Sequence, residues 1–225
     1  MALARCRALG HCPRFVFASS IAVFGGVLPK LITDNTLPMP QGSYGSQKFM
    51  GELLVNDYSR KGFVHGCSLR LPTVVVRPGK PNGAASSFAS AIIREPLADQ
   101  TMVLPVDPAT EMWAASPGVV GNNLMHAVQL PPQAWGQRRS LNLPGRVVSM
   151  TEALEALERV GGERARSHVR HEPDADINRL VSTWAARFET PRADEMGFQR
   201  DADFAAMLHA YVNDYPDAIR VPVKL

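Results

Sequence analysis

The sequence predicts an α/β fold, built on a doubly wound parallel sheet with a smaller second lobe. One apolar run, at residues 15–18, is continuous rather than alternating, and a second run, expected to form another strand, follows at residues 67–71. Continuous apolarity is typical of strands that helices cover on both faces. A helical pattern at residues 43–61 separates the two runs, and this alternation of strand and helix favours a parallel sheet.

Glycine and proline positions delimit the first elements. Residues 1–10 are interpreted as the end of a helix that its last glycine terminates. A loop rich in Gly and Pro covers residues 21–43, and the helix at 43–61 stops at Gly62. Gly51 stands inside this helix, where glycine costs about 1 kcal/mol relative to alanine. We therefore expect another element to approach the helix closely at Gly51.

The composition changes after Pro78, where Pro, Gly and Ser mix with short helical pieces. We therefore expect two parts, residues 1–79 and 80–225, the second being the lobe. Within it, about 138–162 is expected to return to the main sheet. The elements expected in this part are a strand near 140–143, a helix after the capping box Ser149-x-x-Glu152, and helices near 177–188 and 203–211.

The charge pattern gives no sign of a nucleic-acid partner. The 225 residues carry a formal net charge of +3 and are 45% hydrophobic, which is ordinary for a globular protein. Basic residues are scattered, apart from one cluster without interleaved aromatics. Its two histidines lack a further ligand pair, so we expect no metal. The cluster consists of Arg164, Arg166, His168, Arg170 and His171.

The number of cysteines and the length of the apolar runs indicate where in the cell the protein is found. Cys6, Cys12 and Cys67 are odd in number and lack C-x-x-C spacing, which suits a reducing cytosol. No apolar run reaches the roughly 18 residues of a membrane span, and the N-terminus lacks a signal-peptide pattern. We therefore expect a cytoplasmic protein without a membrane partner.

A serine, a tyrosine and a lysine stand where the oxidation of an alcohol needs them. Ser20 ends the first apolar run, and Tyr44 lies in the first turn of the following helix. Lys48 lies four residues later, on the same helix face, and a nearby ammonium favours the phenolate form of a tyrosine. We interpret Tyr44 as the general base toward a substrate hydroxyl, with Ser20 orienting the reacting oxygen. No side chain accepts hydride, so the reaction needs a cofactor.

The alternative is that Tyr44 and Lys48 only share a solvated helix face, since Tyr-x-x-x-Lys often occurs by chance. The order of the segments favours function. A buried strand, Ser-Ser, Val-Phe-Gly, the Tyr-x-x-x-Lys pair and a second strand with Arg-Leu-Pro-Thr follow one another.

These segments resemble the second half of an extended short-chain dehydrogenase/reductase, in the NAD-dependent epimerase/dehydratase group. The resemblance rests on residues 15–25, 44–48 and 69–79 and continues through 192–198, covering essentially the whole chain. It implies the C-terminal part of a Rossmann-type sheet, with the NAD-binding part before residue 80 and the substrate lobe after it.

The resemblance also implies an activity. Residues 46–54 and 77–88 are similar to members of the group that oxidise D-erythronate, a four-carbon sugar acid, at C2 with NAD. We therefore expect oxidation of a small 2-hydroxy sugar acid to a 2-oxo acid. The implied site residues are Ser20, Tyr44 and Lys48 as catalytic groups, Tyr44, Lys48, Leu71, Pro72 and Thr73 toward the cofactor, and Ser20, Arg77 and Lys80 toward the substrate.

Two other functions stay open. The same Ser/Tyr/Lys set serves nucleotide-sugar epimerases and dehydratases, although a diphosphate clamp is visible only in Arg77, Arg138 and Arg139. An inactive fragment, serving at most as an association surface, is the third hypothesis. Related enzymes dimerise through the tyrosine helix, so the resemblance also implies a homodimer.

The chain departs from the group at its start. No glycine cluster follows a strand and opens a helix with the spacing of a phosphate-binding turn. At about 30 residues for each βα unit, roughly 90 residues would precede the first strand in a full member. We therefore expect this chain to bind NAD weakly and to leave the first strand as an uncovered sheet edge.

Overall fold

The protein is described from a computed structural model, which covers residues 10–79 and 85–224. The expected helix end at residues 1–9, and Lys80, lie outside the described residues. The chain forms two compact units of similar length, each assembled from three separate segments. The first unit comprises residues 1–72, 120–144 and 188–199, and the second comprises 73–119, 145–187 and 200–225.

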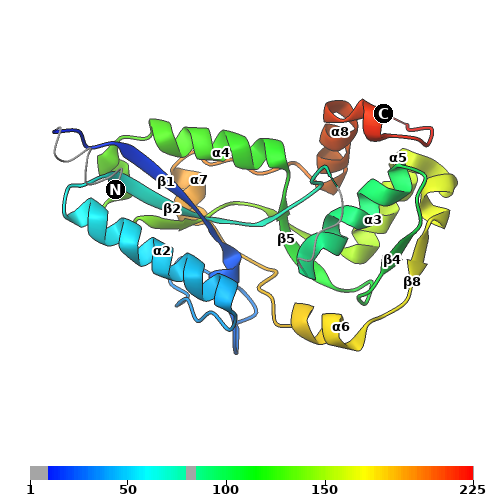
Figure 1. Ribbon diagram of the computed structural model, residues 1–225, viewed down its shortest axis with the longest axis horizontal. Helices are drawn as coiled ribbons and strands as arrows, with labels where there is room; N and C mark the ends of the chain where they lie inside the picture. The colour runs from blue at the N-terminus through cyan, green and yellow to red at the C-terminus, as the bar shows by residue number, and fades with distance from the viewer. Residues whose placement is uncertain (1–9, 80–84, 225) are drawn as a thin grey trace. The chain divides into compact units, whose positions relative to one another are not determined.

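The first unit contains a parallel sheet in the order β1-β2-β6 (Figure 1). β1 (Arg14–Ser20) pairs with β2 (His65–Leu71) along its whole length, from Arg14 opposite His65 to Ser20 opposite Leu71. β6 (Ser140–Asn142) pairs with the other edge of β2. The predicted strands are confirmed, and the one near residues 140–143 joins the same sheet as the first two.

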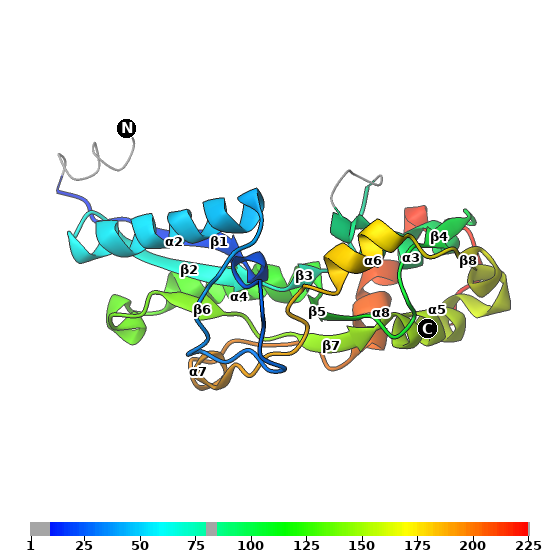
Figure 2. The same ribbon diagram turned by 90° about the horizontal axis from the view of Figure 1, so that it is seen from below.

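Helices cover both faces of this sheet. α2 (Ser43–Arg60) lies over β1 and β2, as Figures 1 and 2 show. On the other face, Cys67, Leu69 and Leu141 form a buried cluster with side chains of α4 (Pro117–Gln129), η3 (Pro132–Trp135) and the segment around α7 (Pro191–Glu195). This two-sided burial explains the continuous apolar run at residues 15–18.

Gly51 is the point of closest approach between α2 and the sheet. A Cβ atom at this position would lie 2.5 Å from Cζ of Phe17 on β1. The expected close approach is therefore confirmed, and the Phe17 ring is the group that requires a glycine there.

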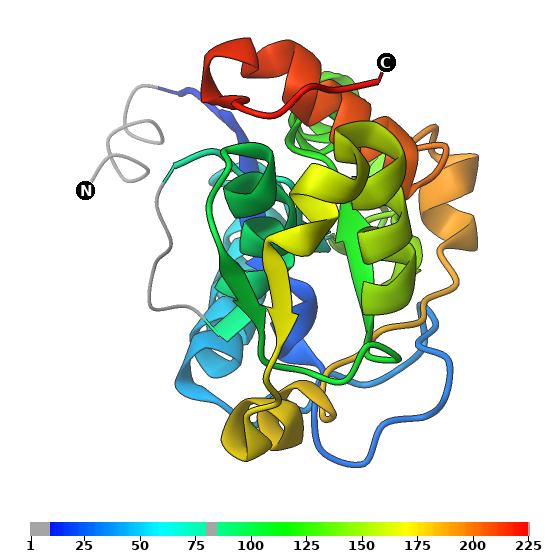
Figure 3. The ribbon, with the colours of Figure 1, turned by 90° about the vertical axis from the view of Figure 1, so that its right-hand side faces the viewer.

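The second unit contains a mixed sheet and a separate strand pair. β3 (Thr73–Val74) runs parallel to β5 (Glu111–Ala115), and β5 runs antiparallel to β7 (Arg146–Ser149). β4 (Met102–Leu104) and β8 (Val169–His171) form a parallel pair, visible side by side in Figure 3.

The core of the second unit lies among three helices. α3 (Phe88–Leu97), α5 (Met150–Ser167) and α8 (Phe204–Asp214) contribute buried side chains such as Ile92, Leu157 and Met207. The remaining short elements are η1 (Ile21–Val23), η2 (Ala85–Ser87), α6 (Ala175–Val181) and η4 (Pro216–Ala218).

The expected helix boundaries are partly right. Ser149 Oγ accepts the N–H of Glu152 at 3.1 Å, so the N-cap half of the expected capping box is confirmed. Helical geometry is interrupted at Gly162, which has φ 67°, and α5 continues beyond this kink to Ser167.

The helix expected over residues 177–188 is wrong, because α6 ends at Val181. The Ser182 and Thr183 hydroxyls donate back to the carbonyls of Arg179 and Leu180, which is typical of residues that leave a helix. Phe188 then lies in a parallel bridge with Ile32. A long-range pairing has therefore replaced the local helical preference. Among the described residues, no helix is both long enough and apolar enough to span a membrane.

Candidate active site

Ser20 lies at the carboxyl edge of the parallel sheet in the first unit. It is the last residue of β1 and stands opposite Leu71, the last residue of β2. Ligand sites of open parallel sheets form at this edge. Ser20 Oγ accepts the N–H of Ala22 at 3.1 Å, which leaves the hydroxyl proton free to be donated to another group.

A glycine brings the start of α2 to the same edge. A Cβ atom on Gly45 would lie only 2.0 Å from the carbonyl oxygen of Ala22 in η1, the element that follows Ser20 directly. Any side chain at this position would force α2 away. Gly45 thus places its neighbour Tyr44 beside the turn that carries Ser20.

Lys48 is held between the end of β1 and the tyrosine ring. Its Nζ donates a hydrogen bond of 2.7 Å to the carbonyl of Ala18 and lies 5.5 Å from the centroid of the Tyr44 ring. It also lies 5.2 Å from the Phe17 ring centroid. An ammonium has three donors, so two others are available to a ligand.

Tyr44 is 59% exposed, so its phenol is accessible to a bound molecule. No hydrogen bond joins Tyr44 to Ser20, both of which are among the described residues. Neither hydroxyl is therefore engaged by the other. The exposure of Tyr44 shows that its ring does not pack in the core, and it suits a residue whose hydroxyl contacts a substrate.

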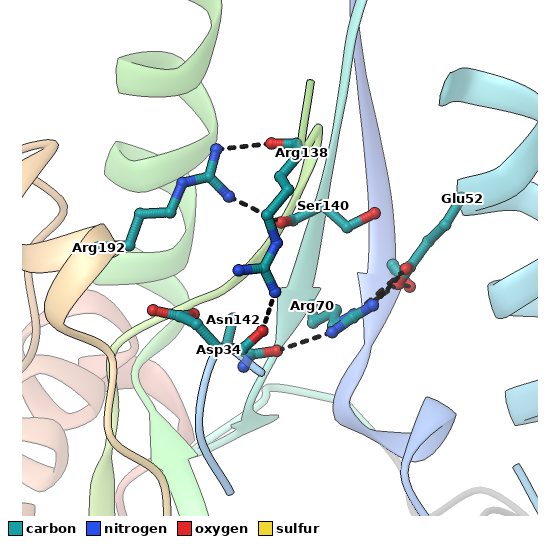
Figure 4. Close-up of polar contacts among 8 residues, drawn as sticks. Asp34, Glu52, Arg70, Arg138, Ser140, Asn142 and Arg192 are labelled. Carbon is teal, nitrogen blue, oxygen red and sulfur yellow. Dashed lines mark hydrogen bonds and ion pairs between the residues drawn. The ribbon is translucent and has the colours of Figure 1, made fainter. Parts of the chain in front are cut away.

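A buried charge network supports the site and was not predicted from the sequence. Glu52, only 2% exposed, accepts a 2.5 Å hydrogen bond from Ser19 Oγ. Both carboxylate oxygens also accept from Arg70, with Nη2 at 2.7 Å from Oε2 and Nε at 2.9 Å from Oε1. Nη1 of Arg70 donates to Oδ1 of Asn142 at 3.3 Å (Figure 4). The network ties α2 to all three strands of the sheet.

A sequence signal for Glu52 exists. Tyr44, Lys48 and Glu52 are spaced four residues apart, so they share one face of α2. The same spacing is also compatible with a solvated helix face, so the burial of Glu52 is evident only from the fold.

The other predicted site residues follow Leu71 along the chain. Pro72 is the last residue of the first unit's opening segment, whereas Thr73 and Arg77 belong to the second unit. The Arg77 backbone N–H donates to Ser90 Oγ at 3.1 Å, and its carbonyl accepts from Arg94 at 2.9 Å. The structure thus brings Ser20, Tyr44, Lys48 and Leu71 to one edge of the first unit.

Cys67, the buried cysteine of the sheet, has no place in the chemistry. Cys67 is buried in the cluster beneath the sheet, and burial raises the pKa of its thiol to about 12. Its thiol is therefore neutral at ordinary pH and acts as an apolar side chain.

Comparison with known proteins identifies the family. Residues 2–113 match the NAD dependent epimerase/dehydratase family, and the chain is 49% identical over 212 residues to D-erythronate dehydrogenase of Cupriavidus necator. The chain belongs to this epimerase/dehydratase family. The match covers 94% of this chain and 65% of the relative. D-erythronate dehydrogenase of Haemophilus influenzae is 45% identical, over 92% of this chain and 66% of the relative.

Two solved structures share this fold. A protein described as a nucleoside-diphosphate-sugar epimerase from Agrobacterium tumefaciens superposes with a TM-score of 0.91 at 43% identity, over 96% of this chain and 63% of the other. L-threonine 3-dehydrogenase from Trypanosoma brucei shares the fold, with a TM-score of 0.82 at 24% identity, over 98% of this chain and 68% of the other. The α/β class with a Rossmann-type sheet is therefore confirmed. The chain spans about two thirds of the length of its curated relatives.

Proposed function

We propose that the chain takes part in NAD-dependent oxidation of D-erythronate or a similar small sugar acid, converting the 2-hydroxy acid to the 2-oxo acid. The observation that carries the proposal is the position of Lys48. Its ammonium is fixed at the end of β1, two residues before Ser20, and faces the Tyr44 ring. The similarity to two D-erythronate dehydrogenases supports the choice of substrate.

The three groups have distinct roles in this proposal. The Ser20 hydroxyl donates a hydrogen bond to the reacting oxygen and fixes its position. Tyr44 removes the proton from the C2 hydroxyl as general base, and the neighbouring Lys48 ammonium stabilises the negative charge that remains on the phenol. Bound NAD supplies the acceptor for the hydride that leaves C2.

The donor set fits the nicotinamide end of the cofactor. The two remaining donors of Lys48 would hold the ribose hydroxyls, and Leu71, Pro72 and Thr73 are the residues expected along the nicotinamide. The 225 residues contain no glycine-rich turn for the pyrophosphate, so we expect NAD affinity weaker than micromolar. Calorimetric titration of the folded chain with NAD measures this, and a micromolar dissociation constant would show that the expectation is wrong.

Arg77 and Lys80 are the proposed partners of the substrate carboxylate. Arginine offers a planar fork that matches a carboxylate, and lysine offers a point charge. Both residues follow the segment proposed to lie along the nicotinamide, so a cation here would orient C2 toward the hydride acceptor.

A nucleotide-sugar epimerase is the second candidate, because the chain is 43% identical to a structure described as one. Product analysis distinguishes the two. Formation of NADH, followed by absorbance, with D-erythronate and not with UDP-glucose supports the acid. Interconversion of the nucleotide sugar without net NADH supports the epimerase.

The outer face of α2 supports a homodimer. Met50, Leu53 and Leu54 are 55%, 55% and 61% exposed and lie within little more than one turn of the helix. Large exposed apolar groups gathered in this way are typical of an association surface. A second copy of the chain is the proposed occupant, because the same surface is present on both subunits of a two-fold dimer.

A further inference from the structure

A cavity of about 220 Å³ opens in the first unit beside the polar face of the sheet. All the residues that line it belong to this unit. They come from α2, β2, β6, the segment before β6, the loop near Asp34 and α7. The volume corresponds to roughly seven water molecules at about 30 Å³ each, so a small ion with part of its hydration shell fits.

The lining of the cavity carries an excess of positive charge. Four arginines face two carboxylates, a formal excess of two positive charges. One of the carboxylates, Glu52, is already neutralised by its bidentate pair with Arg70. Only Asp34 remains to balance Arg138, Arg139 and Arg192, and it forms no ion pair with them within the described residues of this unit.

Uncharged oxygen atoms, mostly backbone carbonyls, hold Arg138 and Arg192 in place without neutralising their charges (Figure 4). Arg192 donates to the carbonyls of Ser140, Trp135 and Arg138. Arg138 donates to the Asp34 carbonyl and to Oδ1 of Asn35. Each guanidinium has five donors, so both keep unused N–H groups while their positions are fixed.

Burial of Arg192 makes its positive charge unfavourable while no anion is bound. Burial, together with the neighbouring Arg138 charge, lowers the pKa of Arg192. A bound anion would reverse this effect by giving both guanidiniums a counter-charge. The arrangement therefore favours occupancy by a negative ion.

An unpartnered amide lies in the same lining. Asn142 is 1% exposed, its Oδ1 accepts from Arg70, and its Nδ2 has no hydrogen-bond partner among the described residues. Buried polar groups normally have partners. The orphan donor is an independent indication that the polar face of β6 is completed by a group from outside the chain.

From these observations we infer that the cavity is a binding site for a tetrahedral oxyanion with two negative charges, either inorganic phosphate or the phosphoryl group of a small molecule. Arg138, Arg139 and Arg192 donate to its oxygens, and the formal excess of two charges matches a dianion. Ser20, Tyr44 and Lys48 do not line this cavity, so the proposed anion site is distinct from the proposed catalytic site.

Isothermal titration calorimetry of the full chain with inorganic phosphate at constant ionic strength tests the inference. We expect saturable one-to-one binding, weakened at least about tenfold in Arg138→Gln through loss of a charge-assisted contact. Arg60→Gln removes the same charge from the exposed side of α2, outside the cavity. This control variant should bind phosphate like the wild type. Equal binding by Arg138→Gln, or an equal loss in Arg60→Gln, overturns the inference.

Two further measurements keep the test decisive if Arg138→Gln does not fold. In ¹⁵N spectra of the wild type, phosphate should shift the Asn142 side-chain amide, and shifts confined to other regions contradict the site. Tighter binding of glycerol phosphate than of inorganic phosphate identifies a phosphoryl ester as the ligand class, and the reverse order identifies free phosphate. Acetate that binds as tightly as phosphate contradicts a dianion site.

Discussion

The Ser19 hydroxyl donates a 2.5 Å hydrogen bond to Oε1 of Glu52 and thereby joins the strand that carries Ser20 to the helix that carries Tyr44 and Lys48. Glu52 lies one turn beyond Lys48 on the same helix face, and Ser19 directly precedes Ser20. Through this one bond, the reactive groups of two different elements are held at a fixed spacing. Glu52 is thus a positioning residue, since it contacts neither the proposed substrate nor the proposed cofactor.

Replacement of Glu52 by Gln should destabilise the first unit strongly. The variant keeps the size of the side chain but leaves the buried Arg70 guanidinium without its counter-charge, at a cost of about 3–5 kcal/mol. Urea denaturation measures the change in the free energy of unfolding. Asp57→Asn, which breaks exposed ion pairs on the same helix, is the matched control and should leave stability nearly unchanged. Similar effects of the two substitutions would contradict the positioning role.

Gly45→Ala should both destabilise the protein and displace the start of α2. A Cβ atom there meets the backbone carbonyl of Ala22, which cannot move aside as a flexible side chain would, so we expect a loss of about 1–3 kcal/mol. Gly118→Ala in α4 meets no atom within 4 Å and should be neutral or stabilising. Thermal unfolding of both variants makes the comparison. A neutral Gly45→Ala would show that α2 does not start against η1.

Asp99 should make stability depend on pH in acid. Arg164 and His168 hold its carboxylate at 2.6 Å and 2.8 Å, and these bonds lower its pKa to about 2. A depressed pKa contributes stability that is fully present above about pH 4 and is lost as the pH falls toward 2. Asn tolerates the positive φ of position 99, so Asp99→Asn is a suitable comparison. The difference in unfolding free energy between the two proteins should be constant at neutral pH and shrink as the pH falls through 2. A difference that persists unchanged at pH 2 would contradict this assignment.

Leu54→Glu should abolish the proposed dimer. The substitution places a charge in the centre of the exposed apolar face of α2, where a second copy would bury it without a partner. Light scattering coupled to size-exclusion chromatography should report twice the chain mass for the wild type and a single chain mass for the variant. Leu180→Glu, at another exposed leucine, should behave like the wild type. A monomeric wild type would contradict the dimer.

Much of the fold could be predicted from local patterns, and the exceptions have long-range causes. The strands at Phe15 and Leu69 follow from their apolarity, and α5 follows from the Ser149 capping box. The helix expected up to Phe188 fails because that residue pairs with Ile32, which no local pattern indicates. Each compact unit also combines three distant segments, and a pairing of distant segments cannot be inferred from composition along the chain.

In the candidate site, too, some residues could be predicted from local sequence patterns and others only from the fold. Ser20, Tyr44 and Lys48 could be singled out because reactive residue types stand at a strand end and at helical spacing. Glu52 could not be distinguished in the same way, because a charged residue in an amphipathic helix is usually solvated. Only the fold reveals that it is buried against Ser19 and Arg70.

The most direct test of the proposed chemistry is the rate of NADH formation from D-erythronate at millimolar NAD, compared between the wild type, Tyr44→Phe and Tyr58→Phe. Tyr58 lies on the same helix but packs edge-on against Phe63, so its hydroxyl serves as the matched control. Loss of the general base should lower the rate at least about 100-fold in Tyr44→Phe, while Tyr58→Phe should keep the wild-type rate. A wild type that forms no NADH would contradict the proposed oxidation, and a Tyr44→Phe variant as fast as the wild type would contradict the assignment of Tyr44 as the base.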